Sequence, residues 1–132
     1  MQQQNQDATS VIEVRGSARG LAVTQRYMEF VNYVYPMAVN WSGKHRVFRD
    51  VFLGRALDQT ALFNDASKSN QVSRLYLADS GLATLREYLR FASNPARKLM
   101  SRHQHEVAEV HLAETGAMLG AWISKLQMGR SR

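Results

Sequence analysis

Apolar residues recur with a helical period along most of the chain, and the first such segment is long. It holds six apolar residues whose separations alternate between four and three: Val23, Tyr27, Phe30, Val34, Met37 and Trp41. This spacing places them on one stripe and predicts a helix from about residue 20 to 41. Pro36 lies inside it and should bend it, because proline removes a backbone donor and clashes with the preceding turn. Ser42-Gly43 is expected to end the helix.

Two further helices are predicted in the middle of the chain. The second helix should run from about 45 to 66, with an inward face made of Phe48, Val51, Phe52, Ala56, Leu62 and Phe63. The third has the most regular pattern, a seven-residue leucine repeat with apolar residues between: Leu75, Leu82 and Leu89, then Ala78, Leu85 and Ala92. Asn94-Pro95 should stop this helix.

The fourth helix has a recognisable start and a surplus of apolar surface. Ser101-Arg102-His103-Gln104 reads as a capping box, so the helix should begin there and continue to about 127. One face carries Leu112, Leu119, Trp122 and Leu126, whereas Val107, Val110, Ala117 and Ala121 point elsewhere. We expect part of this second set to contact another subunit. Gly116 and Gly120, one turn apart, would let another backbone approach closely, although this spacing often arises by chance in soluble helices.

Four helices with short connections predict an all-α, antiparallel up-down four-helix bundle. A chain of 132 residues has room for one such domain. We expect residues 1–18, which are rich in glutamine and lack a sustained period, to form a flexible arm. The bundle should then span 19–128, and 129–132 should form a short basic tail.

The composition indicates in which cellular compartment the protein is expected. No apolar run reaches the roughly 18 residues of a membrane span, and the N-terminal sequence is unlike a secretory signal. The absence of cysteine excludes disulfides, a thiol nucleophile and thiolate metal ligands, and it fits a reducing compartment. We therefore expect a cytoplasmic protein that does not contact a membrane.

The net charge of +6 comes entirely from the middle of the chain. Residues 1–43 and 103–132 are each neutral, whereas the stretch between them holds eleven basic and five acidic residues. Its basic residues are Lys44, Arg46, Arg49, Arg55, Lys68, Arg74, Arg86, Arg90, Arg97, Lys98 and Arg102. A basic surface attracts polyanions such as nucleic acid. The same charge is also compatible with a solvated face that only maintains solubility.

The candidate catalytic and metal-binding groups do not form a recognised pattern. Three histidines (His103, His105, His111) lie near three glutamates (Glu106, Glu109, Glu114), but the Glu-x-x-His pairs of di-iron bundles are missing. Lys68-Ser69 lacks the glycines of a phosphate-binding loop and more closely fits a helix cap. We expect no enzyme activity, no metal and no cofactor.

Arg86 and Arg90 are the most specific basic feature. They are one turn apart on one face of the third predicted helix, beside the leucine stripe. None of the residues three or four positions from Arg86 is acidic. An external anion, an acid on a neighbouring helix or subunit, or ordinary surface exposure would each account for the pair.

Many positions together resemble one known family. They are Tyr33-Val34-Tyr35-Pro36, Lys44-His45, Lys68-Ser69-Asn70-Gln71-Val72-Ser73-Arg74-Leu75-Tyr76, Ala78-Asp79, Gly81-Leu82-Ala83, Leu85-Arg86-Glu87-Tyr88-Leu89-Arg90-Phe91, His103-Gln104 and Gly120-Ala121-Trp122-Ile123. Over about residues 26 to 125 the chain resembles the accessory variability determinant of diversity-generating retroelements.

The resemblance implies a bundle that assembles into a barrel-like homopentamer and binds the retroelement's reverse transcriptase and RNA or DNA. Such a protein is not an enzyme but supports mutagenic copying of a template repeat. Arg86 and Arg90 match the family's arginine pair and are the first candidates for contact with these partners, although Glu87 would partly neutralise Arg90. The weaker candidates are Lys44, Arg46, Arg49, Lys68 and Arg74.

Two other interpretations remain open from the sequence. One is a four-helix bundle of the kind encoded in intervening sequences of ribosomal RNA genes, with another partner. The other is a structural oligomer whose basic residues only balance charge.

Overall fold

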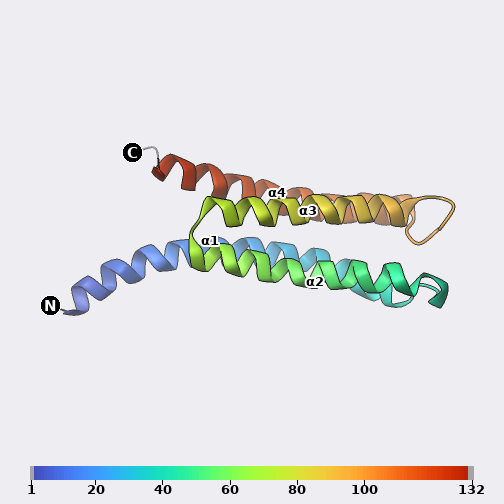
Figure 1. Cartoon of the computed structure of the whole chain (residues 1–132), viewed down its shortest axis with the longest axis horizontal. Helices are drawn as coiled ribbons and strands as arrows, with labels where there is room; N and C mark the ends of the chain where they lie inside the picture. Colours follow the sequence, from blue (N-terminus) through green and yellow to red (C-terminus); the bar gives the residue numbers. More distant parts are fainter. Residues whose placement is uncertain (1, 131–132) are drawn as a thin grey trace.

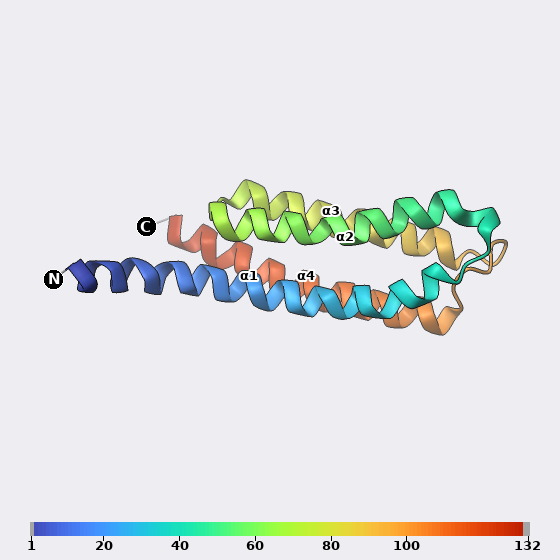
Figure 2. The same ribbon diagram turned by 90° about the horizontal axis from the view of Figure 1, so that it is seen from below.

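The computed structural model describes the backbone of residues 2–130 and the side chains of residues 18–129, and every long element in this part of the chain is a helix. The elements are α1 (Gln2–Val39), a short 3-10 helix η1 (Gly43–His45), α2 (Arg46–Ser69), α3 (Val72–Ser93) and α4 (Arg102–Arg130). Successive long helices run in opposite directions, and α1 and α3 each pack against both α2 and α4 (Figures 1 and 2). This is the predicted up-down four-helix bundle.

The core is formed by the apolar stripes of all four helices. On α3 all six predicted core residues are buried, from Leu75 to Ala92. The stripe predicted for the first helix is buried except for the partly exposed Met37, although its last residue, Trp41, lies just beyond the end of α1. Tyr27 is fully buried, and its hydroxyl donates a hydrogen bond to the carbonyl of Ala56 on α2. Burial raises the pKa of the Tyr27 phenol far above its ordinary value, so it remains a neutral donor.

The predicted face of α2 was partly wrong. Val51 was expected to point inward but is 47% exposed. The buried positions are Phe52, Ala56, Gln59, Phe63 and Ala66, which follow the helical period with a polar residue in the middle. Gln59 is accommodated because its Nε2 donates a hydrogen bond of 2.7 Å to the carbonyl of Ala78 on α3.

The chain ends also differ from the expectation. Helix α1 begins at Gln2, well before the predicted start near residue 20, and α4 continues to Arg130. Adding residues to an existing helix needs no new nucleus, so a helix can extend beyond its packed face. The predicted mobility of residues 1–18 stays a prediction. Of the predicted basic tail, 131–132 lie outside the described residues.

The connections divide the bundle into two different ends. The turn end carries the α1–α2 and α3–α4 connections with their flanking turns, residues 40–49 and 90–102 (right in Figure 1). The hairpin end carries the α2–α3 connection, residues 65–74. At the turn end Trp41 Nε1 donates a hydrogen bond of 2.9 Å to the carbonyl of Leu99, and the rings of Phe48 and Phe91 have centroids 4.5 Å apart. These contacts join the two connections into one surface.

Candidate nucleic-acid interface at the turn end

The seven basic residues predicted from the sequence do not form one patch. Lys44 lies in η1, Arg46 and Arg49 lie in the first turn of α2, and Arg90 lies in the last turn of α3, all at the turn end. Arg86 lies one turn before Arg90 in α3 and is therefore further from the turn end. The remaining two, Lys68 and Arg74, lie at the hairpin end. The structure therefore separates them into a larger and a smaller basic group.

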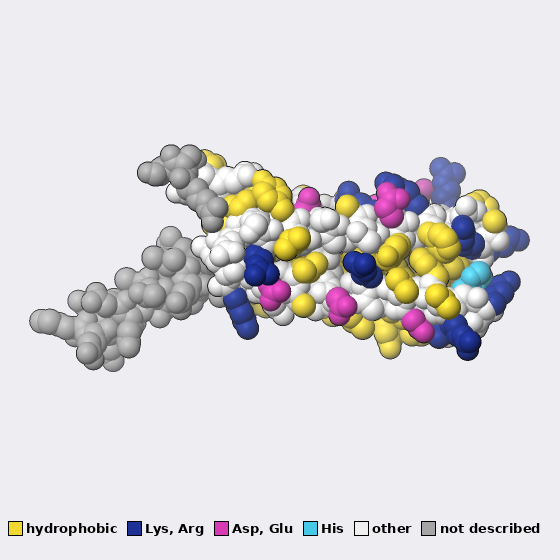
Figure 3. All heavy atoms as spheres, in the orientation of Figure 1, with side chains coloured by type: hydrophobic (Ala, Val, Ile, Leu, Met, Phe, Trp, Pro, Cys, Tyr) yellow, Lys and Arg dark blue, Asp and Glu magenta, His cyan; other side chains and the backbone are white. Residues whose placement is uncertain are grey.

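The turn end gathers three further basic residues that the sequence did not distinguish as site residues. Arg97 and Lys98 lie in the α3–α4 connection, and Arg102 begins α4. All three belong to the basic middle of the sequence, and they approach Lys44 and Arg46 only because the two connections meet at one end. In Figure 3 basic and apolar side chains lie beside one another over this end of the molecule.

Several of these cations already have an acidic partner. Arg49 Nε lies 3.2 Å from Asp50 Oδ1, and Arg102 Nε lies 3.2 Å from Glu106 Oε1. Arg90 pairs with Glu87 one turn earlier, as the sequence suggested. In contrast, no acidic side chain within the described residues pairs with Lys44, Arg46, Arg97 or Lys98. The surplus charge of the turn end therefore belongs mainly to these four.

Arg86 has a partner on the neighbouring helix. Its Nε lies 3.7 Å from Glu109 Oε2 on α4, and Glu109 Oε1 lies 3.3 Å from Nε2 of His105. Of the explanations open for Arg86, the structure supplies the acid on a neighbouring helix. Arg86 Nε and His105 Nε2 are both buried atoms without a well-formed hydrogen bond. The Glu109 carboxylate therefore lies near both nitrogens but forms a well-aligned hydrogen bond with neither.

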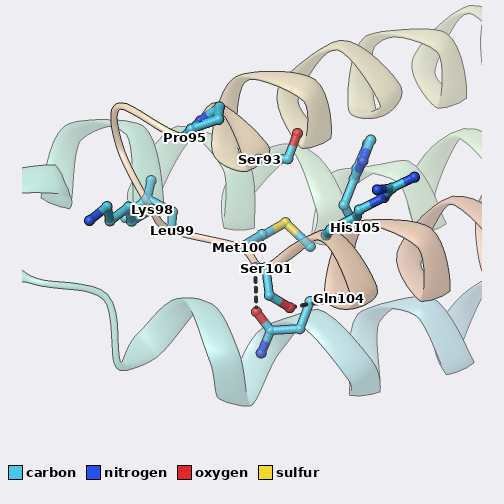
Figure 4. Close-up of a pocket in the computed structure, with 9 residues that line it drawn as sticks. Ser93, Pro95, Lys98, Leu99, Met100, Ser101, Gln104 and His105 are labelled. Atoms are coloured by element: carbon cyan, nitrogen blue, oxygen red, sulfur yellow. Dashed lines mark hydrogen bonds between the residues drawn. The ribbon is translucent and has the colours of Figure 1, made fainter.

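A shallow hollow of about 660 Å³ lies between the end of α3 and the start of α4. It is bounded by Ser93, Pro95, Lys98, Leu99, Met100, Ser101, Arg102, Gln104 and His105. Figure 4 shows Met100 and His105 below the last turn of α3, with Lys98 on the loop to their left. The hollow thus adds a concave basic margin to the turn end.

The floor of this hollow contains the predicted capping box. Ser101 N donates a hydrogen bond of 2.9 Å to Gln104 Oε1, and Gln104 N donates one of 3.1 Å to Ser101 Oγ. The reciprocal pair fixes where α4 starts, and so fixes the direction in which Arg102 and His105 leave the backbone. The prediction of the box is confirmed in both of its hydrogen bonds.

The hairpin end has a weaker basic character. Lys68 and Arg74 line a hollow of about 300 Å³ together with Asp65 and Ser69, so an acid is part of the same surface. Lys68-Ser69 closes α2, and Asn70 follows with a φ of 53° and donates its N–H to the carbonyl of Ala66 at 3.1 Å. The interpretation of this segment as a helix end is confirmed.

One histidine of α4, His111, takes part in a contact between helices. Nδ1 of His111 lies 2.9 Å from Nη1 of Arg26 on α1, and Arg26 Nε donates a hydrogen bond of 2.8 Å to Glu114 Oε2. Among the described residues no three histidine, aspartate or glutamate side chains are arranged to hold a metal ion. Nor does this part of the chain contain a helix long and apolar enough to cross a membrane. The cytoplasmic location stays a prediction.

Comparison with known proteins identifies the family. A search of curated proteins gives no match. A family model described as bAvd-like matches residues 21–126, which is most of the chain and nearly the whole bundle. The name stands for the bacterial accessory variability determinant, an accessory component of diversity-generating retroelements and not a catalytic one. The chain therefore belongs to the bAvd-like family.

Proposed function

We propose that this protein, without being an enzyme itself, binds the reverse transcriptase and the RNA or DNA of a diversity-generating retroelement and so supports mutagenic copying of a template repeat. The family match over residues 21–126 supports the retroelement role. The observation that carries nucleic-acid binding is the group of cations without acidic partners at the turn end, Lys44, Arg46, Arg97 and Lys98.

The proposed contact is electrostatic. A cation without an acidic partner can neutralise a phosphate and release its condensed counterions, whereas a paired cation must first separate from its carboxylate. Lys44 in η1 and Arg46, the first residue of α2, are both exposed and are separated by one residue. They are therefore better placed than Arg49 and Arg90, whose charges are partly neutralised by Asp50 and Glu87.

A pair of double variants tests where nucleic acid binds. K44A/R46A removes two exposed cations from the turn end, and R55A/K125A removes two exposed, unpaired cations elsewhere on the described surface. Affinity for a labelled RNA is measured at several salt concentrations. For K44A/R46A the logarithmic salt slope should become shallower by about 0.7–0.9 for each phosphate that is no longer neutralised, while the control should keep the wild-type slope. Equal slopes for the two variants would contradict the location.

Binding of the reverse transcriptase is tested separately, by co-purification with the enzyme encoded beside the gene. Failure of wild-type protein to co-purify would remove the partner but leave nucleic-acid binding in place. The neighbourhood of the gene also discriminates the bundles of ribosomal RNA intervening sequences, because a retroelement member should lie beside a reverse transcriptase gene and a template repeat. If the wild-type protein shows no salt-dependent RNA binding, the interpretation as a structural oligomer is favoured instead.

Self-association into a homopentamer is part of the proposal. Val110 on α4 is 53% exposed, and a Cβ added to Gly116 or Gly120 would meet nothing within 4 Å, so α4 has apolar and small residues that no other helix of the chain covers. Light scattering should give five times the monomer mass of 15.0 kDa at micromolar concentration. A monomeric mass would remove the barrel and any basic surface built from repeated copies.

A further inference from the structure

Arg97 is held against an aromatic ring and not against an acid. Its guanidinium carbon lies 3.7 Å from the centroid of the Phe91 ring, within the range of a cation–π contact. Its Nη1 donates one long hydrogen bond, 3.4 Å, to the carbonyl of Phe91. A guanidinium has five N–H donors, so most of its hydrogen-bonding capacity and its full charge stay available.

The ring beneath Arg97 is exposed but firmly supported. Phe91 is 40% exposed, and its other neighbour is Phe48, whose centroid is 4.5 Å away. Phe48 in turn stacks with Trp41 at 5.8 Å and meets Tyr88 edge-on at 5.9 Å. This row of rings reaches into the core, so the Phe91–Arg97 pair rests on a rigid base at the surface of the turn end.

The backbone that carries Arg97 is also fixed. Asn94 organises the turn, because its Oδ1 accepts a hydrogen bond of 2.9 Å from Ala96 N and its carbonyl accepts one of 2.9 Å from Arg97 N. Met100 N donates to the carbonyl of Ala92 at 3.2 Å and closes the loop against α3. Because the loop is already ordered, binding a ligand that stacks on Arg97 would cost the protein little conformational entropy.

From these contacts we infer that the Phe91–Arg97 pair is a stacking platform for an unpaired nucleobase, so that the turn end binds single-stranded nucleic acid in preference to a duplex. Unpaired bases stack on aromatic rings and on guanidinium planes, and they offer their edges to free N–H donors. Lys44, Arg46 and Lys98, which have no acidic partner among the described residues, lie at the same end of the bundle as the platform and would hold the flanking phosphates. The bases of a duplex are already stacked, so a duplex can use only these charges.

This inference rests on the proposed function and can fail while that function stands. The test uses full-length protein and three labelled probes of equal length: a single-stranded RNA, the same strand with abasic positions in place of bases, and its duplex. Wild type should bind the RNA strand about fivefold or more tightly than the abasic strand, the lower part of the range for stacking one base.

Two single variants each remove one part of the platform, and each keeps one property of the residue it replaces: the positive charge of Arg97 or the apolar character of Phe91. R97K retains the positive charge but loses the planar guanidinium, and F91L retains an apolar side chain without a ring. Each should lower affinity for the RNA strand by about fivefold and leave duplex affinity unchanged. R55K, on an exposed arginine of α2 that contacts no aromatic ring in the described part of the chain, serves as the matched control and should bind all three probes like wild type.

The outcomes separate the alternatives. Equal binding of wild type to RNA and abasic strands would overturn the inference and leave a purely electrostatic interface. A change of mass in light scattering for F91L, with RNA affinity unaltered, would overturn it by making Phe91 a contact between subunits. Failure of wild type to bind any of the three probes at low salt would contradict the proposed function itself.

Discussion

At the scale of single residues, Gly81 shows how a helix-breaking residue can be required inside a helix. It lies in the middle of α3, where alanine would ordinarily be preferred. A Cβ at this position would lie 2.1 Å from Oε1 and 3.0 Å from Cδ of the buried Gln59. Because the other end of that amide is hydrogen-bonded to Ala78, the side chain has no easy way to withdraw.

We expect G81A to destabilise the protein by about 1–2 kcal/mol, since the substitution overpacks a buried site and disturbs a buried hydrogen bond. Denaturant unfolding followed by circular dichroism measures the change. G54A is the matched control: Gly54 also lies inside a helix, but nothing is within 4 Å of its added Cβ, so it should gain about 0.5–1 kcal/mol. If both variants gain stability, the steric account of Gly81 is wrong.

Lys98 lies in the left-handed region, with a φ of 55°, which is unfavourable for a residue with a Cβ. Lys98 closes the turn that begins at Asn94, because its N–H donates a hydrogen bond of 3.2 Å to the carbonyl of Asn94. Lys98 thus combines a backbone cost with an unpaired charge at the turn end.

The two properties of Lys98 can be separated by substitution. K98G and K98A remove the same charge, but only glycine relieves the backbone, so K98G should be more stable than K98A by about 0.5–1 kcal/mol. Their affinities for RNA should be equally reduced, because neither retains the ammonium group. Thermal melts and salt titrations of both proteins check this, and a difference in RNA affinity between them would mean that the shape of the loop, and not the charge, governs binding.

At the scale of elements, the start of α4 depends on two reciprocal hydrogen bonds between Ser101 and Gln104. We expect S101A to cost about 1 kcal/mol, because it leaves an N–H at the helix start without its acceptor. S101D should retain most of the stability, since aspartate is an equally good cap. S124A, at an exposed position inside α4, is the control and should be neutral or slightly stabilising. Equal melting temperatures for S101A and S124A would show that the cap contributes nothing measurable.

The elements also show what a sequence pattern can and cannot reveal. All six residues predicted for the face of α3 are buried, because every buried position of this helix is apolar and nothing polar interrupts the repeat. Val72 in the first turn was the one buried position left out. On α2 the buried Gln59 interrupts the apolar period and was not predicted, and Val51 was placed on the inward face although it is exposed. Periodicity measures hydrophobicity and cannot see a polar side chain that finds its partner on another helix.

The site was predictable only in part, for a related reason. Charge counting located the basic middle of the chain, and the four-helix pattern implied that alternate connections share an end. The pairing of Arg86 with Glu109 and the stacking of Arg97 on Phe91 depend on contacts between helices or on the path of a loop. Neither contact has a fixed spacing in sequence, so neither leaves a motif.

Across the molecule as a whole, the basic residues differ in whether an acidic side chain pairs with them. Four cations of the turn end have no acidic partner among the described residues, whereas Arg90 at the end of α3 and Arg86 one turn before it are each paired with a glutamate. The two groups should therefore play different parts: free cations suit phosphates, while arginines that already exchange contacts with carboxylates suit an acidic surface of a protein partner.

The double variant R86A/R90A tests this division. The bundle should remain folded, with a loss of no more than about 1 kcal/mol, because Arg86 and Arg90 are 39% and 62% exposed and surface ion pairs are screened by solvent. RNA affinity and its salt slope should change little, but the reverse transcriptase should no longer co-purify. E87Q, which frees Arg90 from its acid and adds one net positive charge, should instead raise RNA affinity modestly if Arg90 contacts RNA, and should leave it unchanged if Arg90 contacts the enzyme. Unaltered co-purification together with unaltered RNA binding in R86A/R90A would make the pair ordinary surface charge, and would move the proposed contact with the retroelement's partners to the turn end alone.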